Sequence, residues 1–144
     1  DRSVSRGLGD VYKRQSLRNL EKSKFADPTA EFVLEGTIRN YILTFDLAWK
    51  VMKDILVKQL GITDFAIGSP REVLQSAFTN GLISDDIWLK MLKTRNLLAH
   101  DYDGIIAKKN FRAIISNYYD AFDGLKDAIT KFYDGSLPSI DSFD

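Results

Sequence analysis

The stretch LEGTIRNYILTFDLAWKVMKDIL, residues 34–56, decides the fold because its apolar residues recur at helical spacing. These residues form two neighbouring rows. The first row is Leu34, Ile38, Tyr41, Phe45, Ala48, Met52 and Ile55, and the second row is Ile42, Trp49 and Leu56. Steps of three, four and seven place these residues on one wide stripe of a helix of about nine turns. The sequence therefore predicts a long helix that buries this stripe against other helices.

Helix-start and helix-stop residues divide the flanking sequence into further helices. Asp27-Pro28 supplies an N-cap and a first-turn proline for the long helix, and Gly61 is expected to end it. Ser69-Pro70-Arg71-Glu72 is typical of a capping box, and it predicts a short helix that stops at Asn80-Gly81. Ser84-Asp85-Asp86 predicts the start of a fourth helix, with acids at its positive end.

The last helix is expected to be capped by Asp103 and to contain a glycine, Gly124, as a close-packing point. Its apolar stripe is Phe111, Ile114, Ile115, Tyr118, Phe122, Leu125, Ile129 and Phe132. Residues 16–25 look like the remnant of a first helix. No repeat and no strand-like alternation is present, so the sequence predicts an all-α, antiparallel bundle of four to five helices whose first helix is truncated.

Length and composition fit one soluble globular domain. The chain has 144 residues, of which 44% are hydrophobic and 28% are charged. Twenty basic and twenty acidic residues give zero net charge, which argues against a generic nucleic-acid coat but allows a local basic patch. The chain has no cysteine, so it has no disulfide and no thiolate metal site. No apolar run approaches the ~20 residues of a membrane span, and no secretory signal is visible.

The two ends of the chain are expected to lie outside the folded domain. Residues 5–15, SRGLGDVYKRQ, resemble the translation of a transposon-end sequencing adapter, so residues 1–15 are interpreted as adapter-derived and the native N-terminus as missing. The helical domain is then residues 16–134. Residues 135–144 are rich in serine and aspartate and are expected to form a flexible tail.

The only histidine, His100, lies in the segment Arg95-Asn96-Leu97-Leu98-Ala99-His100-Asp101-Tyr102, called here the signature segment. Histidine titrates near neutral pH and is the usual carrier of acid/base chemistry, although a lone histidine near a helix end is more often a cap or a surface residue. On a helical wheel centred on Trp88, the apolar stripe contains Met91, Leu92, Arg95, Ala99 and Tyr102. Lys93, Asn96, His100 and Asp103 share the polar edge beside it.

An arginine on an apolar stripe needs a partner because an unpaired buried charge is costly. One account pairs Arg95 with an acid such as Glu35, Asp46 or Asp54. The other makes Arg95 part of a phosphate site, where arginine grips the phosphate, His100 moves protons and Asn96 orients a hydroxyl or a water. One histidine and scattered acids do not form a metal-ligand pattern, so no metal or cofactor is expected.

Arg-x-x-x-x-His-x-Tyr, with Asn directly after the Arg, resembles the signature of the HEPN superfamily. Five blocks, in order, resemble its nucleotidyltransferase substrate-binding subgroup, over roughly residues 25–133: Glu35–Ile38, Phe45–Lys50, Ser69–Glu72, Gly81–Ile83 and Trp88–Tyr102. Two positions depart from the pattern. Ala99 stands where relatives often have Ser, and Asp101, where they often have Thr, adds a negative charge beside the expected phosphate site.

The resemblance implies a HEPN-like bundle that forms a homodimer through the helix bearing the signature. It implies a prokaryotic cytoplasmic protein that pairs with a minimal nucleotidyltransferase. It further implies a toxin that is a metal-independent endoribonuclease using Arg95, Asn96 and His100, with Lys93 as a possible RNA contact. The partner would silence this toxin by adding AMP to Tyr102, whose bulk and charge would repel RNA.

Two other functions remain open. One is a non-catalytic subunit that presents substrate to a nucleotidyltransferase, which the name of the resembled subgroup and the zero net charge favour. The other is a purely structural helical adaptor in which His100 is only a helix cap. Cleavage by the 2′-hydroxyl needs a base and an acid on opposite sides of the phosphorus, whereas each chain has one histidine. The enzyme hypothesis therefore predicts that a second His100 comes from another copy, across a two-fold axis.

Overall fold

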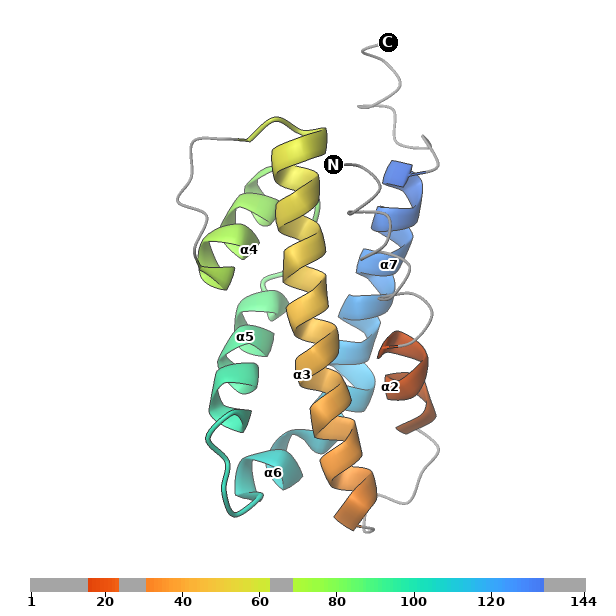
Figure 1. Cartoon of the computed structure of the whole chain (residues 1–144), viewed down its shortest axis with the longest axis vertical. Coiled ribbons are helices and arrows are strands. Elements are labelled where there is room, and N and C mark those ends of the chain that lie inside the picture. The colour runs from red at the N-terminus through yellow and green to blue at the C-terminus, as the bar shows by residue number, and fades with distance from the viewer. Residues whose placement is uncertain (1–15, 24–30, 63–68, 134–144) are drawn as a thin grey trace.

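Every regular element in the described part of the chain is a helix (Figure 1). The computed structural model describes residues 16–23, 31–62 and 69–133. Its elements are α2 (Leu17–Ser23), α3 (Glu31–Asp54), α4 (Pro70–Thr79), α5 (Ile87–Leu98), α6 (Ile105–Ala113) and α7 (Tyr119–Tyr133). The π-helical turns η2 (Ile55–Gln59) and η3 (Ile114–Tyr118) extend α3 and join α6 to α7. The all-α prediction is confirmed, while the predictions for residues 1–15, Asp27-Pro28 and residues 135–144 lie outside the described residues.

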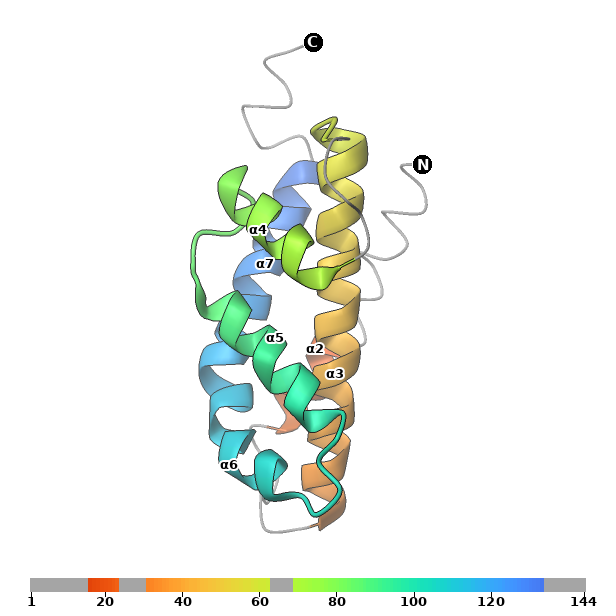
Figure 2. The same cartoon turned by 90° about the vertical axis from the view of Figure 1, so that its left-hand side faces the viewer.

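Helix α3 is the axis around which the other helices pack. It contacts α2, α4, α5, α6 and α7. Successive long helices alternate in direction: α3 runs up the view, α5 runs down, and α6 leads back into the ascending α7 (Figure 1). Helix α4 and helix α5 follow one another along the same side of α3 (Figure 2). This arrangement is the predicted antiparallel bundle, and no described helix is both long enough and apolar enough to cross a membrane.

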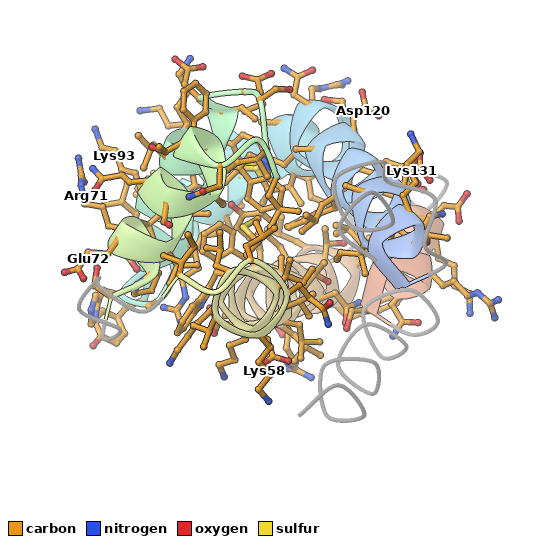
Figure 3. All side chains as sticks on the ribbon, turned by 90° about the horizontal axis from the view of Figure 1, so that it is seen from above. Lys58, Arg71, Glu72, Lys93, Asp120 and Lys131 are labelled. Atoms are coloured by element: carbon orange, nitrogen blue, oxygen red, sulfur yellow. The ribbon has the colours of Figure 1, made fainter. Side chains whose placement is uncertain are left out.

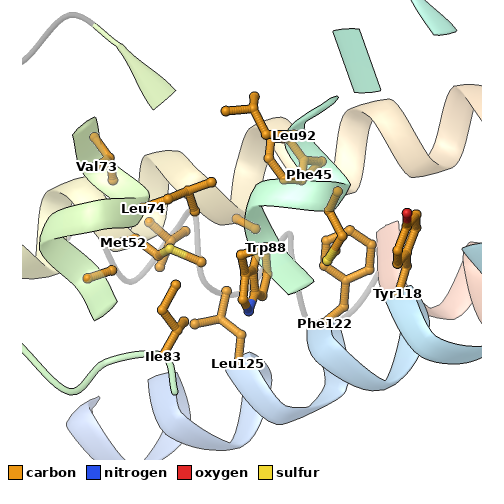
Figure 4. Packing of buried hydrophobic residues seen from close by; sticks show 14 of the residues in the cluster. Phe45, Met52, Val73, Leu74, Ile83, Trp88, Leu92, Tyr118, Phe122 and Leu125 are labelled. Atoms are coloured by element: carbon orange, nitrogen blue, oxygen red, sulfur yellow. The ribbon is translucent and has the colours of Figure 1, made fainter. Parts of the chain in front are cut away.

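The core forms where the predicted stripes of α3 and α7 meet the buried face of α5. Trp88 lies between them, with Phe45 and Met52 of α3 on one side and Phe122 and Leu125 of α7 on the other (Figure 4). The ring centroids of Trp88 and Phe122 are 5.6 Å apart in an edge-on arrangement, and those of Phe45 and Trp88 are 6.2 Å apart. Each side chain of this size contributes about 1.5–3 kcal/mol when fully buried, so the aromatic centre is a main source of stability.

The predicted helix ends at Gly61, Ser69 and Gly81 are confirmed. Gly61 and Gly81 have positive φ values of 68° and 79°, which glycine adopts without steric cost. After each glycine the next amide donates back into its helix, from Ile62 to the Leu56 carbonyl and from Leu82 to the Ala77 carbonyl. The Ser69 hydroxyl accepts from the Glu72 amide at 3.3 Å, which is the serine half of the predicted capping box.

Two sequence-based expectations about the later helices are wrong. Helix α5 ends at Leu98, so Ala99 is exposed and Tyr102 is 94% exposed instead of lying on the apolar stripe. The buried residues of α5 are Trp88, Met91, Leu92, Thr94 and Leu98, so its buried face includes Thr94 and Leu98 and not Arg95. Gly124 is not a close-packing point among the described residues, because a Cβ atom there would meet none of their atoms within 4 Å.

Candidate functional site

Helix α5 carries the start of the signature segment, and buried polar contacts hold it from behind. The Tyr41 hydroxyl of α3 donates to the Met91 carbonyl at 2.7 Å. The hydroxyls of Thr94 and Tyr118 lie 3.1 Å apart, and the rings of Tyr41 and Tyr118 stack with centroids 5.7 Å apart. Burial raises the pKa of Tyr41 well above its usual range, so this phenol keeps its proton. These contacts fix the rotation of α5 and so fix which of its residues face outward.

Arg95 lies at the seam between α5 and α3, where it pairs with Asp46. Its Nε and Nη2 atoms donate to Oδ1 and Oδ2 of Asp46, each at 3.0 Å. The two side chains are 27% and 28% exposed. The hydrogen bond to Asp46 is the main cause of a raised pKa for Arg95, so the guanidinium stays charged. The pairing account named Asp46 as one of three possible partners, and Asp46 is the one present.

The turn after α5 is organised by Asp101. Its two carboxylate oxygens accept from the amides of Ile106 and Ala107 at 3.0 and 2.8 Å. Asp103, which was expected to cap the last helix, accepts from a single amide among the described residues, that of Ile105, at 3.3 Å. Asp101 is therefore the principal cap of α6, and its negative charge is partly offset by the positive end of that helix. The sequence-based cap assignment missed this because Asp101 lies four residues before α6 begins and reaches it across the turn.

The remaining signature side chains project outward. Asn96, His100 and Tyr102 are all exposed, and the side chains of Asn96 and His100 hydrogen-bond to no described residue. His100 lies beyond the end of α5, so of the residues expected to share the polar edge of one helix only Lys93 and Asn96 are on it. The chain thus separates the candidate residues: Arg95 faces α3, Asn96 lies on the outer face of α5, and His100 and Tyr102 flank the anchored Asp101.

Lys93 and Asn96 share a surface hollow of about 480 Å³ between α5 and the start of α4. Its other principal lining residues are Arg71, Leu89, Lys90 and Leu97. Arg71 and Lys90 were not singled out from the sequence. The spacing of Lys90, Lys93 and Asn96 at steps of three does indicate a shared helix face, whereas Arg71 comes from another helix and its place required the fold.

No group of three or more potential metal ligands is present among residues 16–23, 31–62 and 69–133. The carboxylates near the signature segment are already engaged, that of Asp46 by Arg95 and that of Asp101 by the amides of α6. The guanidinium of Arg95 and the amide of Asn96 are group types that bind phosphate. The arrangement offers a guanidinium, an imidazole and an amide at one end of the bundle. It is suited to an anionic substrate that approaches from solvent.

A family model described as "nucleotidyltransferase substrate binding protein like" matches residues 12–131, which is most of the chain. A search of curated protein sequences finds no match. The fold and the site define an all-α helical bundle whose α5 and following turn carry the Arg, Asn, His and Tyr of the signature segment. The chain belongs to the nucleotidyltransferase substrate-binding protein family, as the resemblance of its sequence blocks predicted.

Proposed function

We propose that this protein is the HEPN-type toxin partner of a minimal nucleotidyltransferase and acts as a metal-independent endoribonuclease. The observation that carries the proposal is that the side chains of Asn96 and His100 are exposed and unused within the described chain, while Arg95 of the same segment is fixed and charged. Exposed imidazole and amide groups that form no hydrogen bond within the described chain are available to a substrate. Family membership supports the nucleotidyltransferase as the partner.

In the proposed reaction the 2′-hydroxyl of RNA attacks the adjacent phosphorus. One His100 takes the proton of that hydroxyl, the bond from phosphorus to the 5′-oxygen breaks, and a second His100 gives that oxygen a proton. The products are a 2′,3′-cyclic phosphate and a 5′-hydroxyl. Arg95 stabilises the charge that develops on the phosphoryl oxygens. Its Nη1 atom has no partner in the described part of the chain, so it remains available while Nε and Nη2 hold Asp46.

The second His100 is supplied by another copy of the chain in this proposal. Exposed apolar side chains lie on and after the end of α5: Leu97, Tyr102 and Ile105 are 46%, 94% and 60% exposed. Burying such side chains between two copies would stabilise a dimer and bring the same patch of both chains together. A two-fold axis there would place one His100 on each side of a bound phosphate.

Tyr102 is the proposed off switch. Its near-complete exposure gives a nucleotidyltransferase access to the phenol oxygen, and it lies two residues from His100. Transfer of AMP from ATP would join the phenol oxygen to the α-phosphorus and release pyrophosphate. The added phosphate and nucleoside would then repel RNA and obstruct its approach to His100.

The test is cleavage of single-stranded RNA by the purified chain in the presence of EDTA, compared with His100→Ala and with Lys109→Ala as an exposed control. The proposal expects cleavage by the native chain and by Lys109→Ala, and a loss of at least about 100-fold in His100→Ala. Equal cleavage by His100→Ala would refute the enzyme assignment.

A second candidate function is a non-catalytic subunit that presents substrate to the nucleotidyltransferase. It is supported by the Arg95–Asp46 pair, since part of the guanidinium is already used within the chain. It expects no RNA cleavage and an undiminished complex between His100→Ala and the nucleotidyltransferase. Measuring complex formation by the same variants therefore separates the two functions.

A further inference from the structure

Polar side chains form a row along the outer face of α5, on the helix that immediately precedes His100. Lys90, Lys93 and Asn96 follow one another at steps of three residues, and His100 comes four residues later, just past the helix end. At 1.5 Å per residue the helical part of this row spans about 9 Å. All four side chains are exposed. The helical part of the row therefore lies just before the proposed reacting group in the chain.

The first three members of the row line the hollow between α4 and α5, where a fourth polar residue joins them. Arg71, from the first turn of α4, lies on the same side of the molecule as Lys93 (Figure 3). Asp120 and Lys131 lie on the opposite side, over α7. We name the hollow lined by Arg71, Lys90, Lys93 and Asn96 the basic hollow.

The cations of the basic hollow have no acidic partner in the described part of the chain. Arg71, Lys90 and Lys93 form no ion pair there, and none of the described acids lines the hollow. Glu72 follows Arg71 in the sequence, but it is not among the lining residues. Elsewhere Lys58 and Lys126 pair with acids of their own helices, at 3.2 and 3.1 Å. In a chain with zero net charge, three cations gathered around one concavity make a local positive field.

Apolar side chains complete the hollow. Leu89 and Leu97 are 36% and 46% exposed, and both line it. Together with the cations they offer a surface that can contact sugar and base while lysine and arginine bind the backbone. Leucine side chains and unpaired cations lie side by side in this hollow, so it suits the bases and the phosphates of a nucleic-acid strand, whereas an acidic protein segment would use the cations alone. The last polar residue that lines it, Asn96, precedes His100 by four residues.

We propose that the basic hollow binds the backbone phosphates of a single-stranded RNA and guides the strand along α5 to His100. Arg71 and Lys90 are thereby assigned to RNA binding alongside Lys93. The identity of the ligand as RNA rests on the proposed function. Binding and cleavage are separate measurements, so failure of one is distinguishable from failure of the other.

The test measures binding of a fluorescent, unstructured single-stranded RNA by anisotropy across a series of salt concentrations, in a His100→Ala background that prevents cleavage. The test variant is Arg71→Gln, Lys90→Gln, Lys93→Gln. The matched control is Arg18→Gln, Lys22→Gln, Lys131→Gln, which removes one arginine and two lysines that are exposed on α2 and α7. Circular dichroism verifies that both triple variants are folded.

Each phosphate contact to a single strand contributes about −0.7 to the slope of log affinity against log salt, so the test variant should lose about 2 from that slope. If the test variant and the His100→Ala parent bind RNA equally at about 1 M salt, the test variant should bind about 100-fold more weakly than the parent at about 0.1 M salt. The control variant should bind within about threefold of the parent. Equal losses in both triple variants, unchanged binding by the test variant, or absence of RNA binding by the parent would each overturn the proposal. So would a test variant that binds RNA normally but no longer binds the nucleotidyltransferase. Binding through the hollow without any cleavage by the native chain would retain the proposal and refute only the ribonuclease.

Discussion

Arg95 of α5 and Asp46 of α3 form a bidentate ion pair in which both nitrogen–oxygen distances are 3.0 Å. The pair joins the helix that carries the signature segment to the axis of the bundle. It also fixes the orientation of the guanidinium, because two parallel hydrogen bonds define its plane.

A double-mutant cycle on Asp46 and Arg95 tests the strength of this link. We expect Asp46→Ala to lower the free energy of unfolding by about 1–2 kcal/mol, because it leaves a partly buried cation unpaired. The coupling energy between Asp46 and Arg95 should be about 1 kcal/mol, which is less than for a fully buried ion pair because solvent screens this partly exposed one. Urea denaturation supplies the measurement, and the more exposed Asp123–Lys126 pair, expected to couple by less than about 0.5 kcal/mol, is the control. Additive effects at Asp46 and Arg95 would contradict the pairing.

Asp101 is expected to matter more for stability than Asp103. Asp101→Ala removes acceptors from two amides at the start of α6 and should cost about 1–2 kcal/mol of unfolding free energy. Asp103→Ala should cost less than about 0.5 kcal/mol, since its contact to Ile105 is single and longer. Chemical denaturation measures the unfolding free energy of both variants. A larger loss in Asp103→Ala than in Asp101→Ala would show that the cap is assigned to the wrong residue.

Tyr41→Phe should have an effect on stability that depends on pH. At neutral pH it loses the hydrogen bond to Met91, at a cost of about 1 kcal/mol. Burial raises the pKa of Tyr41 above its ordinary value of 10.0, so at higher pH the unfolded chain releases a proton that the folded chain retains. This contribution to stability is complete below pH 10 and declines as the pH rises above it. The difference in melting temperature between the native chain and Tyr41→Phe should therefore narrow between pH 9 and about pH 11; a constant difference would contradict the buried phenol.

Tyr102→Phe should separate ribonuclease activity from its silencing. The ring stays and only the exposed hydroxyl is lost, so cleavage of RNA should remain within about threefold of native. Incubation with the nucleotidyltransferase and ATP should silence the native chain but not this variant, and mass spectrometry should detect an added AMP only on the native chain. Tyr119→Phe, at a half-buried tyrosine, is the control and should be silenced normally. If the nucleotidyltransferase silences Tyr102→Phe, the residue that is modified is not Tyr102.

Most of the fold could be predicted from the sequence because its local rules agree with its packing. The stripe of α3, the glycines at the ends of two helices and the serine cap of α4 each have a local physical cause, and the structure confirms them. The end of α5 could not be placed in this way. The apolar period continues past Leu98, whereas Asp101 anchors the following turn to α6 and stops the helix there.

The candidate site was predictable in its residue types but not in its geometry. The order of Arg95, Asn96, His100 and Tyr102 is readable from the sequence. Which acid pairs with Arg95 depends on the register between α3 and α5, and the contribution of Arg71 depends on how α4 approaches α5. Both depend on how the helices are aligned against one another. The apolar periodicity of a sequence indicates which face of a helix is buried but not this alignment.

The most direct test of the central claim is RNA cleavage by dimers assembled at random from equal amounts of native chain and His100→Ala. If each reaction needs a His100 from both copies, only dimers of two native chains are active, and about one quarter of the activity of the same total amount of native protein remains. If each copy acts alone, about one half remains. A residual activity near one quarter is the predicted result, and one near one half would contradict the shared site.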